Sequence, residues 1–196
     1  MTQFNLSTTD ASKLVQKQSL NGGKKLTLKS TLPRKHISNK TYILADISGS
    51  MSGDRLHELK KALHKVWRPG IHGIAFGSLV YDFTEADIDS LAVIGTTNML
   101  DALLAGWEDT ASHMVLLTDG QPDQSESTIL NEVNMHTDIP IDTIGIGLRC
   151  NNDFLQRISE ITGGKFNSIN EPLMLTEVME DLLRIAEKGT SGCITL

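Results

Sequence analysis

The side chains best suited to chemistry in this 196-residue chain lie in three short segments that are rich in oxygen. Residues 46–50 read Asp-Ile-Ser-Gly-Ser, residues 95–98 read Gly-Thr-Thr-Asn, and residues 118–120 read Thr-Asp-Gly. Alternate residues of an extended segment point the same way, so the acid and two hydroxyls of the first segment can converge. Oxygen donors without His or Cys suit a hard divalent cation such as Mg²⁺, with Mn²⁺ or Ca²⁺ as alternatives. The candidate ligands are Asp46, Ser48, Ser50, Thr97 and Asp119.

Short apolar runs separated by amphipathic stretches surround these segments. The runs predict six strands, over residues 42–45, 73–76, 79–83, 113–118, 139–144 and 165–169. Several runs are apolar throughout, which is typical of strands that are buried on both faces. Apolar residues at helical spacing predict helices over residues 56–66, 100–107, 154–161 and 175–185, and a weaker one over 124–136.

Strands that alternate with helices predict an α/β fold with a doubly wound, mostly parallel six-stranded sheet and helices on both faces. The connection between residues 76 and 79 is too short for a crossover. Those two strands should therefore form a hairpin, which makes one edge strand antiparallel. Ligands of such sheets bind beyond the carboxyl ends of the strands, where the segments at residues 46 and 118 begin. We expect the three oxygen-rich segments to meet at that edge.

The charge distribution divides the chain into an arm, a body and a tail. Residues 1–40 carry eight Lys or Arg and one Asp, a net charge of +7, and the rest of the chain carries −13. This predicts a basic N-terminal arm at 1–40, a folded domain at 41–190 and a tail at 191–196. The arm could fold onto its own acidic body, dock on an acidic neighbour or bind nucleic acid. Nucleic acid is the least favoured, because one aromatic residue offers no platform for stacking bases.

The three segments, in this order at strand ends, resemble the metal-ion-dependent adhesion site (MIDAS) of the von Willebrand factor type A domain family. The resemblance covers about 150 residues, from Thr41 to Lys188. It implies a Rossmann-like fold in which the hydroxyls of Ser48, Ser50 and Thr97 bind the cation directly. Asp46 and Asp119 would act largely through water. The departure is Thr96, which stands where the family loop has glycine and leaves the geometry of that loop open.

The resemblance implies a non-enzymatic, Mg²⁺-dependent interaction module that binds an Asp or Glu of a partner protein. Three further acids, Asp54, Asp101 and Asp123, are predicted at the rim of the site, either as partner-selecting charges or as ordinary solubilising ones. The alternative is a structural subunit of a larger, phage-like assembly, in which the arm docks on a neighbour and the metal is accessory. An accessory to an ATPase machine and a stress-operon protein are other settings that the family offers.

Other signals are weaker. Ser48 and Ser50 have no histidine nearby in sequence to act as a base, which argues against nucleophilic catalysis. The six histidines lack zinc-binding spacing and are predicted to be solvated surface groups. The absence of a signal peptide, of an apolar run long enough to span a membrane and of a disulfide framework predicts a cytoplasmic protein. Cys193 begins a C-terminal prenylation-like box, but no polybasic cluster precedes it, so lipidation is not expected.

Overall fold

The computed structural model describes residues 40–109, 111–119 and 121–191. The predicted arm, apart from Lys40, and residues 192–196 lie outside the described residues, as does Gly120 of the third oxygen-rich segment. The interpretations placed on the arm and on Cys193 therefore stay predictions.

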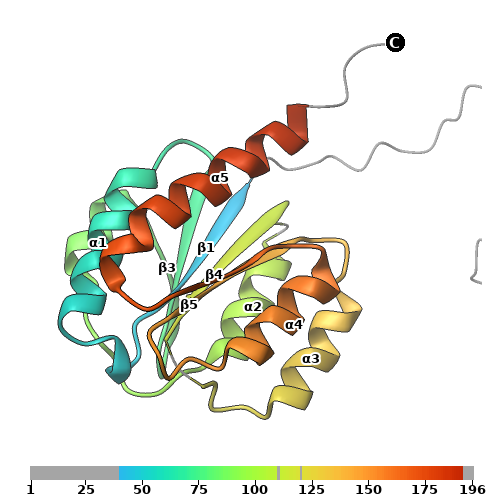
Figure 1. Ribbon diagram of the computed structural model, residues 1–196, viewed down its shortest axis with the longest axis horizontal. Coiled ribbons are helices and arrows are strands. Elements are labelled where there is room, and N and C mark those ends of the chain that lie inside the picture. The colour runs from blue at the N-terminus through green and yellow to red at the C-terminus, as the bar shows by residue number, and fades with distance from the viewer. Residues whose placement is uncertain (1–39, 110, 120, 192–196) are drawn as a thin grey trace, which may run out of the picture. The chain divides into compact units, whose positions relative to one another are not determined.

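A six-stranded sheet forms the centre of the folded domain, and its strand order is β3-β2-β1-β4-β5-β6 (Figure 1). Its strands are β1 (Thr41–Asp46), β2 (Ile71–Phe76), β3 (Val80–Phe83), β4 (His113–Thr118), β5 (Ile141–Ile146) and β6 (Phe166–Ile169). The pairs β1–β2, β1–β4, β4–β5 and β5–β6 are parallel, and the hairpin strand β3 lies antiparallel to β2 at the edge. The predicted fold class and all six predicted strands are confirmed.

Five helices cover the two faces of this sheet (Figure 1). One face carries α1 (Asp54–Val66) and α5 (Leu175–Ser191), and the other carries α2 (Met99–Glu108), α3 (Glu126–Met135) and α4 (Asn152–Thr162). Short 3₁₀ turns occur at Gly49–Met51, Glu85–Ser90 and Pro172–Met174. The weakly predicted helix 124–136 is present as α3, because Ile129, Leu130 and Val133 give it a buried face.

Each face of the sheet has its own apolar core. On one side Ile43, Ala45 and Val115 pack with the buried faces of α1 and α5. On the other, Leu44 and Leu116 pack with α2, α3 and α4. The alternation along β1 and β4 explains why these strands read as continuous apolar runs: successive side chains enter opposite cores.

None of the helices in the described part of the chain is both long and apolar enough to cross a membrane.

The prediction that the histidines are solvated surface groups is wrong for three of them. His113 begins β4 with a side chain that is only 11% exposed, and its Nε2 lies 2.9 Å from Oδ2 of Asp142. The half-buried rings of His136 and His72 stack on Trp107 and Tyr42, with centroids 4.2 Å and 5.0 Å apart. Sequence spacing could not reveal these contacts, because the partners are 29 or 30 residues apart.

Candidate metal-binding site

Asp46 ends β1 and is fully buried, although its carboxylate is held only by neutral groups among the contacts that we find. Its Oδ1 accepts a 2.7 Å hydrogen bond from the backbone N–H of Ser48, and its Oδ2 accepts one of 2.6 Å from the hydroxyl of Thr118. Burial raises the pKa of Asp46, and the negative charge of Asp119 adds to the rise, while the hydrogen bonds from Thr118 and Ser48 oppose it. The ionised form therefore lacks full compensation within the site.

A chain of hydroxyl contacts connects this segment to the end of β4. The Oγ atoms of Ser48 and Ser50 lie 3.0 Å apart, and the Ser50 hydroxyl donates to Oδ1 of Asp119 at 2.6 Å. Ser48 and Asp119 are buried, whereas Ser50 is exposed. Parallel pairing of β1 with β4 places the ends of both strands at one edge, so residues 69 positions apart come into contact. Four of the five predicted ligands thus form one connected cluster.

The fifth, Thr97, lies in a loop that is joined to this cluster through the backbone. The N–H of Gly49 donates to the carbonyl of Gly95 at 2.9 Å. Gly95 has φ +53°, and a Cβ there would lie 2.0 Å from Oγ of Ser78, so only glycine fits. Thr97 is 7% exposed, and no contact of its hydroxyl with the other four predicted ligands is found among the described residues.

Thr96, which departs from the family glycine, is accommodated by the hairpin between β2 and β3. Its N–H donates to Oγ of Ser78 at 2.9 Å, and its own Oγ1 lies 3.3 Å from the same atom. The extra side chain therefore contacts an exposed serine outside the ligand cluster and leaves Thr97 buried. This contact is consistent with a loop stiffened by Thr96.

All three predicted rim acids are exposed, but two of them also hold the loop of Thr97 in place. Asp123 accepts from the N–H of Thr97 at 3.1 Å, and its own N–H donates to the Thr97 carbonyl at 3.0 Å. Asp101 accepts from Nδ2 of Asn98 at 2.7 Å, while its N–H donates to the Asn98 side chain that caps α2. Asp54 lies in the first turn of α1, where a negative charge favours the helix dipole.

Two side chains with clear roles in this cluster were missed by sequence reasoning. Thr118 orients Asp46, as described above. Arg55, the second residue of α1, donates through Nη1 to Oδ2 of Asp119 and, at 3.0 Å, to the carbonyl of Ser50. A signal for Arg55 was present: a cation in the first turn of a helix opposes the helix dipole, so it calls for a nearby anion.

The donor set fits a hard divalent cation on the chemistry of its atoms. Among the described residues, one cationic group, that of Arg55, is found in contact with the carboxylates of Asp46 and Asp119, and it pairs with Asp119. The two carboxylates therefore outnumber the cations beside the hydroxyls of the cluster. In the described parts of the chain, no group of three or more His, Cys, Asp or Glu side chains is placed to hold a metal. A cation here would therefore depend on serine and threonine oxygens, which Mg²⁺ accepts together with retained water.

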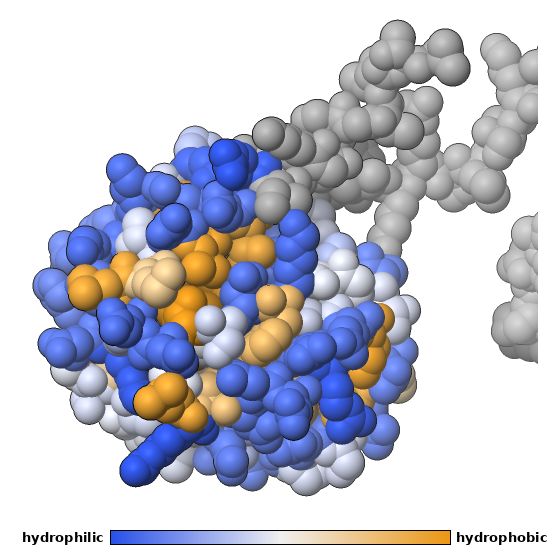
Figure 2. All heavy atoms as spheres, in the orientation of Figure 1, coloured by the Kyte–Doolittle hydropathy of each residue, from blue (hydrophilic) through white to orange (hydrophobic). Residues whose placement is uncertain are grey.

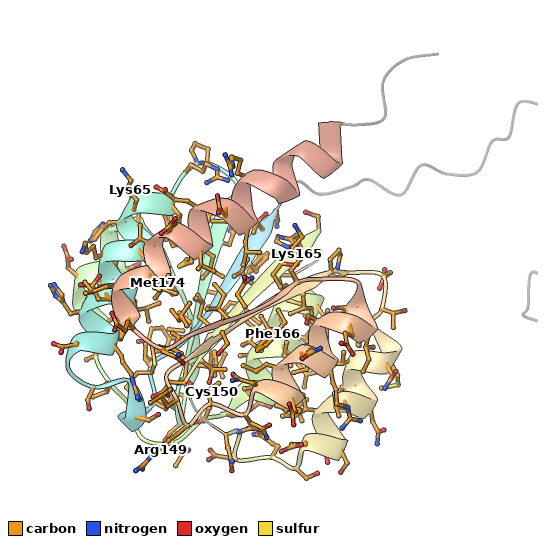
Figure 3. The ribbon with its side chains drawn as sticks, in the orientation of Figure 1. Lys65, Arg149, Cys150, Lys165, Phe166 and Met174 are labelled. Carbon is orange, nitrogen blue, oxygen red and sulfur yellow. The ribbon has the colours of Figure 1, made fainter. Side chains whose placement is uncertain are left out.

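Exposed apolar side chains accompany the same edge of the sheet. They follow β2, β5 and β6 at their carboxyl ends and are Leu79, Leu148, Leu173 and Met174, which are 63%, 83%, 66% and 50% exposed. In Figure 3, Met174 lies at the start of α5, and Arg149 lies beside buried Cys150 in the loop after β5. Figure 2 shows an apolar area near the centre of the visible face and smaller ones elsewhere, each bordered by hydrophilic residues.

Several known proteins resemble this chain in sequence. The family model of the von Willebrand factor type A domain matches residues 80–167. Human von Willebrand factor A domain-containing protein 3B is 35% identical over 86 residues, which covers 42% of this chain and 7% of that protein. Inter-alpha-trypsin inhibitor heavy chain H1 from Bos taurus is 26% identical over 183 residues, covering 74% of this chain and 20% of that protein. The chain therefore spans a fifth or less of these relatives.

Solved structures agree in fold. The von Willebrand factor type A protein from Catenulispora acidiphila is 20% identical with a TM-score of 0.67, and the match covers 77% of this chain and 42% of that one. Proximal thread matrix protein 1 from the mussel byssus, in a structure with a zinc-occupied MIDAS motif, is 20% identical with a TM-score of 0.59. The match covers 75% of this chain and 45% of that one. The family model and the curated relatives thus relate part of this chain to the von Willebrand factor type A domains, which are generally protein-interaction modules, and the solved structures share its fold.

Proposed function

We propose that this domain is a non-enzymatic module that binds a protein partner through a divalent cation at the carboxyl edge of its sheet. The observation that carries the proposal is the connected cluster of Asp46, Ser48, Ser50 and Asp119, with the loop of Thr97 held beside it. Ser48, Ser50 and Thr97 would hold the ion through their hydroxyls, and Asp46 and Asp119 would act through water.

Mg²⁺ is the proposed ion, because the donors are all oxygen and few of them are charged. When bound, the cation supplies a Lewis-acidic position that a carboxylate from another protein can occupy. The protein's own groups orient the site: burial shields the Asp46 carboxylate from bulk solvent, and hydrogen bonds from Thr118 and Ser48 fix its orientation. The zinc in the mussel protein's MIDAS makes Zn²⁺ and Mn²⁺ necessary comparisons in any binding measurement.

The partner surface is proposed to extend beyond the ion. A single carboxylate contact gives little specificity, and a stable interface buries about 1,000 Å² or more. The exposed side chains of Leu79, Leu148 and Met174 lie on loops at the same edge and offer apolar contact area. We therefore propose a partner with an Asp or Glu flanked by apolar residues.

Isothermal titration calorimetry with Mg²⁺, Mn²⁺ and Zn²⁺ tests the ion site. We expect one ion per chain, and we expect Asp46→Ala to abolish the binding because it removes a carboxylate from the cluster. The matched control is Asp89→Asn, which changes an exposed acid that is paired with His64 on α1. A wild-type protein that binds none of the three ions would refute the proposal.

Affinity capture with the purified chain tests the partner. We expect the captured protein to be released by EDTA, and to be missing when Asp46→Ala serves as bait. An assembly that is insensitive to EDTA and is lost when residues 1–40 are deleted would instead support the structural-subunit alternative.

A further inference from the structure

Arg55 is held beside the candidate metal-binding cluster, at the carboxyl edge of the sheet, by contacts from three segments of the chain. Besides donating to Asp119 and to the Ser50 carbonyl, its guanidinium lies over Gly147, directly after β5: a Cβ on Gly147 would come 3.0 Å from Nη2. Gly147 has φ +91° and lacks a side chain, which leaves room for the guanidinium. The side chain is 34% exposed, so it is anchored at the boundary between the cluster and solvent.

The two oxygens of Asp119 have separate partners. Oδ1 accepts from the hydroxyl of Ser50, one of the proposed ligands, whereas Oδ2 accepts from Arg55. The guanidinium thus contacts the carboxylate on the oxygen that the hydroxyl cluster does not use. Arg55 can remain in place while the other side of Asp119 serves the ion.

The charge count then gives Arg55 a function, provided that the proposed cation site exists. Asp46 and Asp119 contribute −2 and Arg55 contributes +1, which leaves −1 before a divalent ion binds and +1 afterwards. Without Arg55 the corresponding charges are −2 and 0. A nearby positive charge repels the incoming cation and attracts an incoming carboxylate, and both effects are strong in a partly buried site.

We propose that Arg55 is a specificity-determining residue: it weakens binding of the divalent cation and strengthens binding of a carboxylate guest to the loaded site. The two effects have opposite signs. A residue that merely supported the fold would weaken both kinds of binding when replaced, so the signs distinguish the two roles.

The test compares wild type with Arg55→Gln and Arg55→Lys, and uses Arg157→Gln as a control of equal charge change on the exposed face of α4. Calorimetry with Mg²⁺ measures the first effect. We expect Arg55→Gln to bind Mg²⁺ roughly ten-fold more tightly. Arg55→Lys should stay within a few-fold of wild type, because it keeps the charge, and Arg157→Gln should not differ from wild type.

Acetate is the probe for the second effect. In Mn²⁺-loaded protein, acetate displaces an ion-bound water, and the enhancement of water-proton relaxation falls. We expect Arg55→Gln to need several-fold more acetate than wild type, and Arg55→Lys to need about the same amount. Thermal unfolding in EDTA shows whether each variant is folded.

The outcomes separate this inference from the proposed function. If wild type binds the ion, and Arg55→Gln leaves both affinities unchanged or lowers both, the role of Arg55 is overturned while the metal site stands. If wild type binds none of the tested ions, the metal site and the role of Arg55 are both overturned.

Discussion

Two buried aspartates at opposite ends of the sheet have different surroundings. Asp142, near the start of β5, is 6% exposed; its Oδ2 lies 2.9 Å from Nε2 of His113 and its Oδ1 accepts from the N–H of Lys165 at 2.7 Å. Asp46, at the end of β1, accepts from the Thr118 hydroxyl and the Ser48 N–H, and no charged donor contacts it among the described residues; Asp119 lies close enough to raise its pKa. At the amino ends of the parallel strands, the carboxylate of Asp142 joins two segments. At their carboxyl ends, around Asp46 and Asp119, negative charge is left in excess.

The difference indicates what each edge is for. The Asp142 carboxylate joins the His113 ring to the backbone of the segment before β6, and such buried hydrogen bonds stabilise the fold. The excess of negative charge among hydroxyls at the other edge disfavours the ion-free fold and favours a cation. Burial alone therefore does not distinguish the two roles, but the partners of the carboxylate do.

The largest expected effect on the free energy of unfolding comes from replacing each of the two aspartates, in separate variants, by a neutral residue. Asp142→Ala should lower the free energy of unfolding by about 2–4 kcal/mol with or without Mg²⁺, because His113 and the N–H of Lys165 lose a buried partner. Asp46→Asn should change the metal-free value by about 1 kcal/mol or less, because burial already disfavours its charge. It should remove the stabilisation by Mg²⁺.

Urea unfolding with Mg²⁺ and with EDTA measures both variants. The comparison breaks down if Asp142→Ala abolishes the response to Mg²⁺, or if Asp46→Asn retains it.

A smaller effect is expected from two buried threonines. Thr118→Val removes the hydroxyl that orients Asp46, and should cost about 1–2 kcal/mol in EDTA and weaken Mg²⁺ binding several-fold. Thr143→Val is the matched control, because that threonine is equally buried and its hydroxyl donates to a backbone carbonyl, that of Leu155, at 3.0 Å. It should cost a similar amount of stability without changing the affinity for Mg²⁺. Equal affinities in the two variants would contradict a role for Thr118 in the site.

The smallest expected effect of Mg²⁺ concerns Cys150. Its Sγ donates to the carbonyl of Thr118, the last residue of β4, at 3.7 Å. Burial raises its pKa to about 11, and the charges of Asp119 and Asp46 add to the rise. We expect iodoacetamide to label Cys150 slowly in the folded protein at pH 8 and quickly in urea, and Mg²⁺ to change this little because burial is the main cause.

The raised pKa of Cys150 also makes the stability of the fold depend on pH. An unfolded thiol ionises near pH 9, and the folded one only near 11, so this group contributes stability below pH 9 that is lost as the pH rises towards 11. Cys193→Ser leaves Cys150 as the only thiol of the chain for this measurement. Labelling at the same rate in folded and unfolded protein would contradict the assignment.

Much of the fold could be predicted because local patterns and topology agree. The apolar runs marked all six strands, and the short step from residue 76 to residue 79 correctly placed the antiparallel edge. Helix boundaries were less accurate: α1 and α4 each begin two residues earlier than predicted, and α5 continues six residues beyond the predicted end. The first two residues of α1 and of α4 are polar or charged and carry no apolar signal.

The candidate site was predicted only in part, for a physical reason. Asp46, Ser48 and Ser50 lie close in sequence, so their convergence follows from the backbone, and Asp119 follows from parallel pairing. The place of Arg55 in the first turn of a helix indicated a nearby anion but not which one, and the partners of Arg55 and Asp123 depend on how separate loops cross the edge. Asp123 was expected at the rim of the site, and in the structure it also holds the backbone of Thr97.

By itself, the sequence determined the α/β architecture and the oxygen-rich chemistry at the carboxyl edge, because hydrophobic periodicity and donor type are properties of the residues themselves. Only the tertiary structure decided which carboxylates are neutralised and which are not. That depends on the distance from each carboxylate to charges and hydrogen-bond donors on other segments, and packing alone sets those distances.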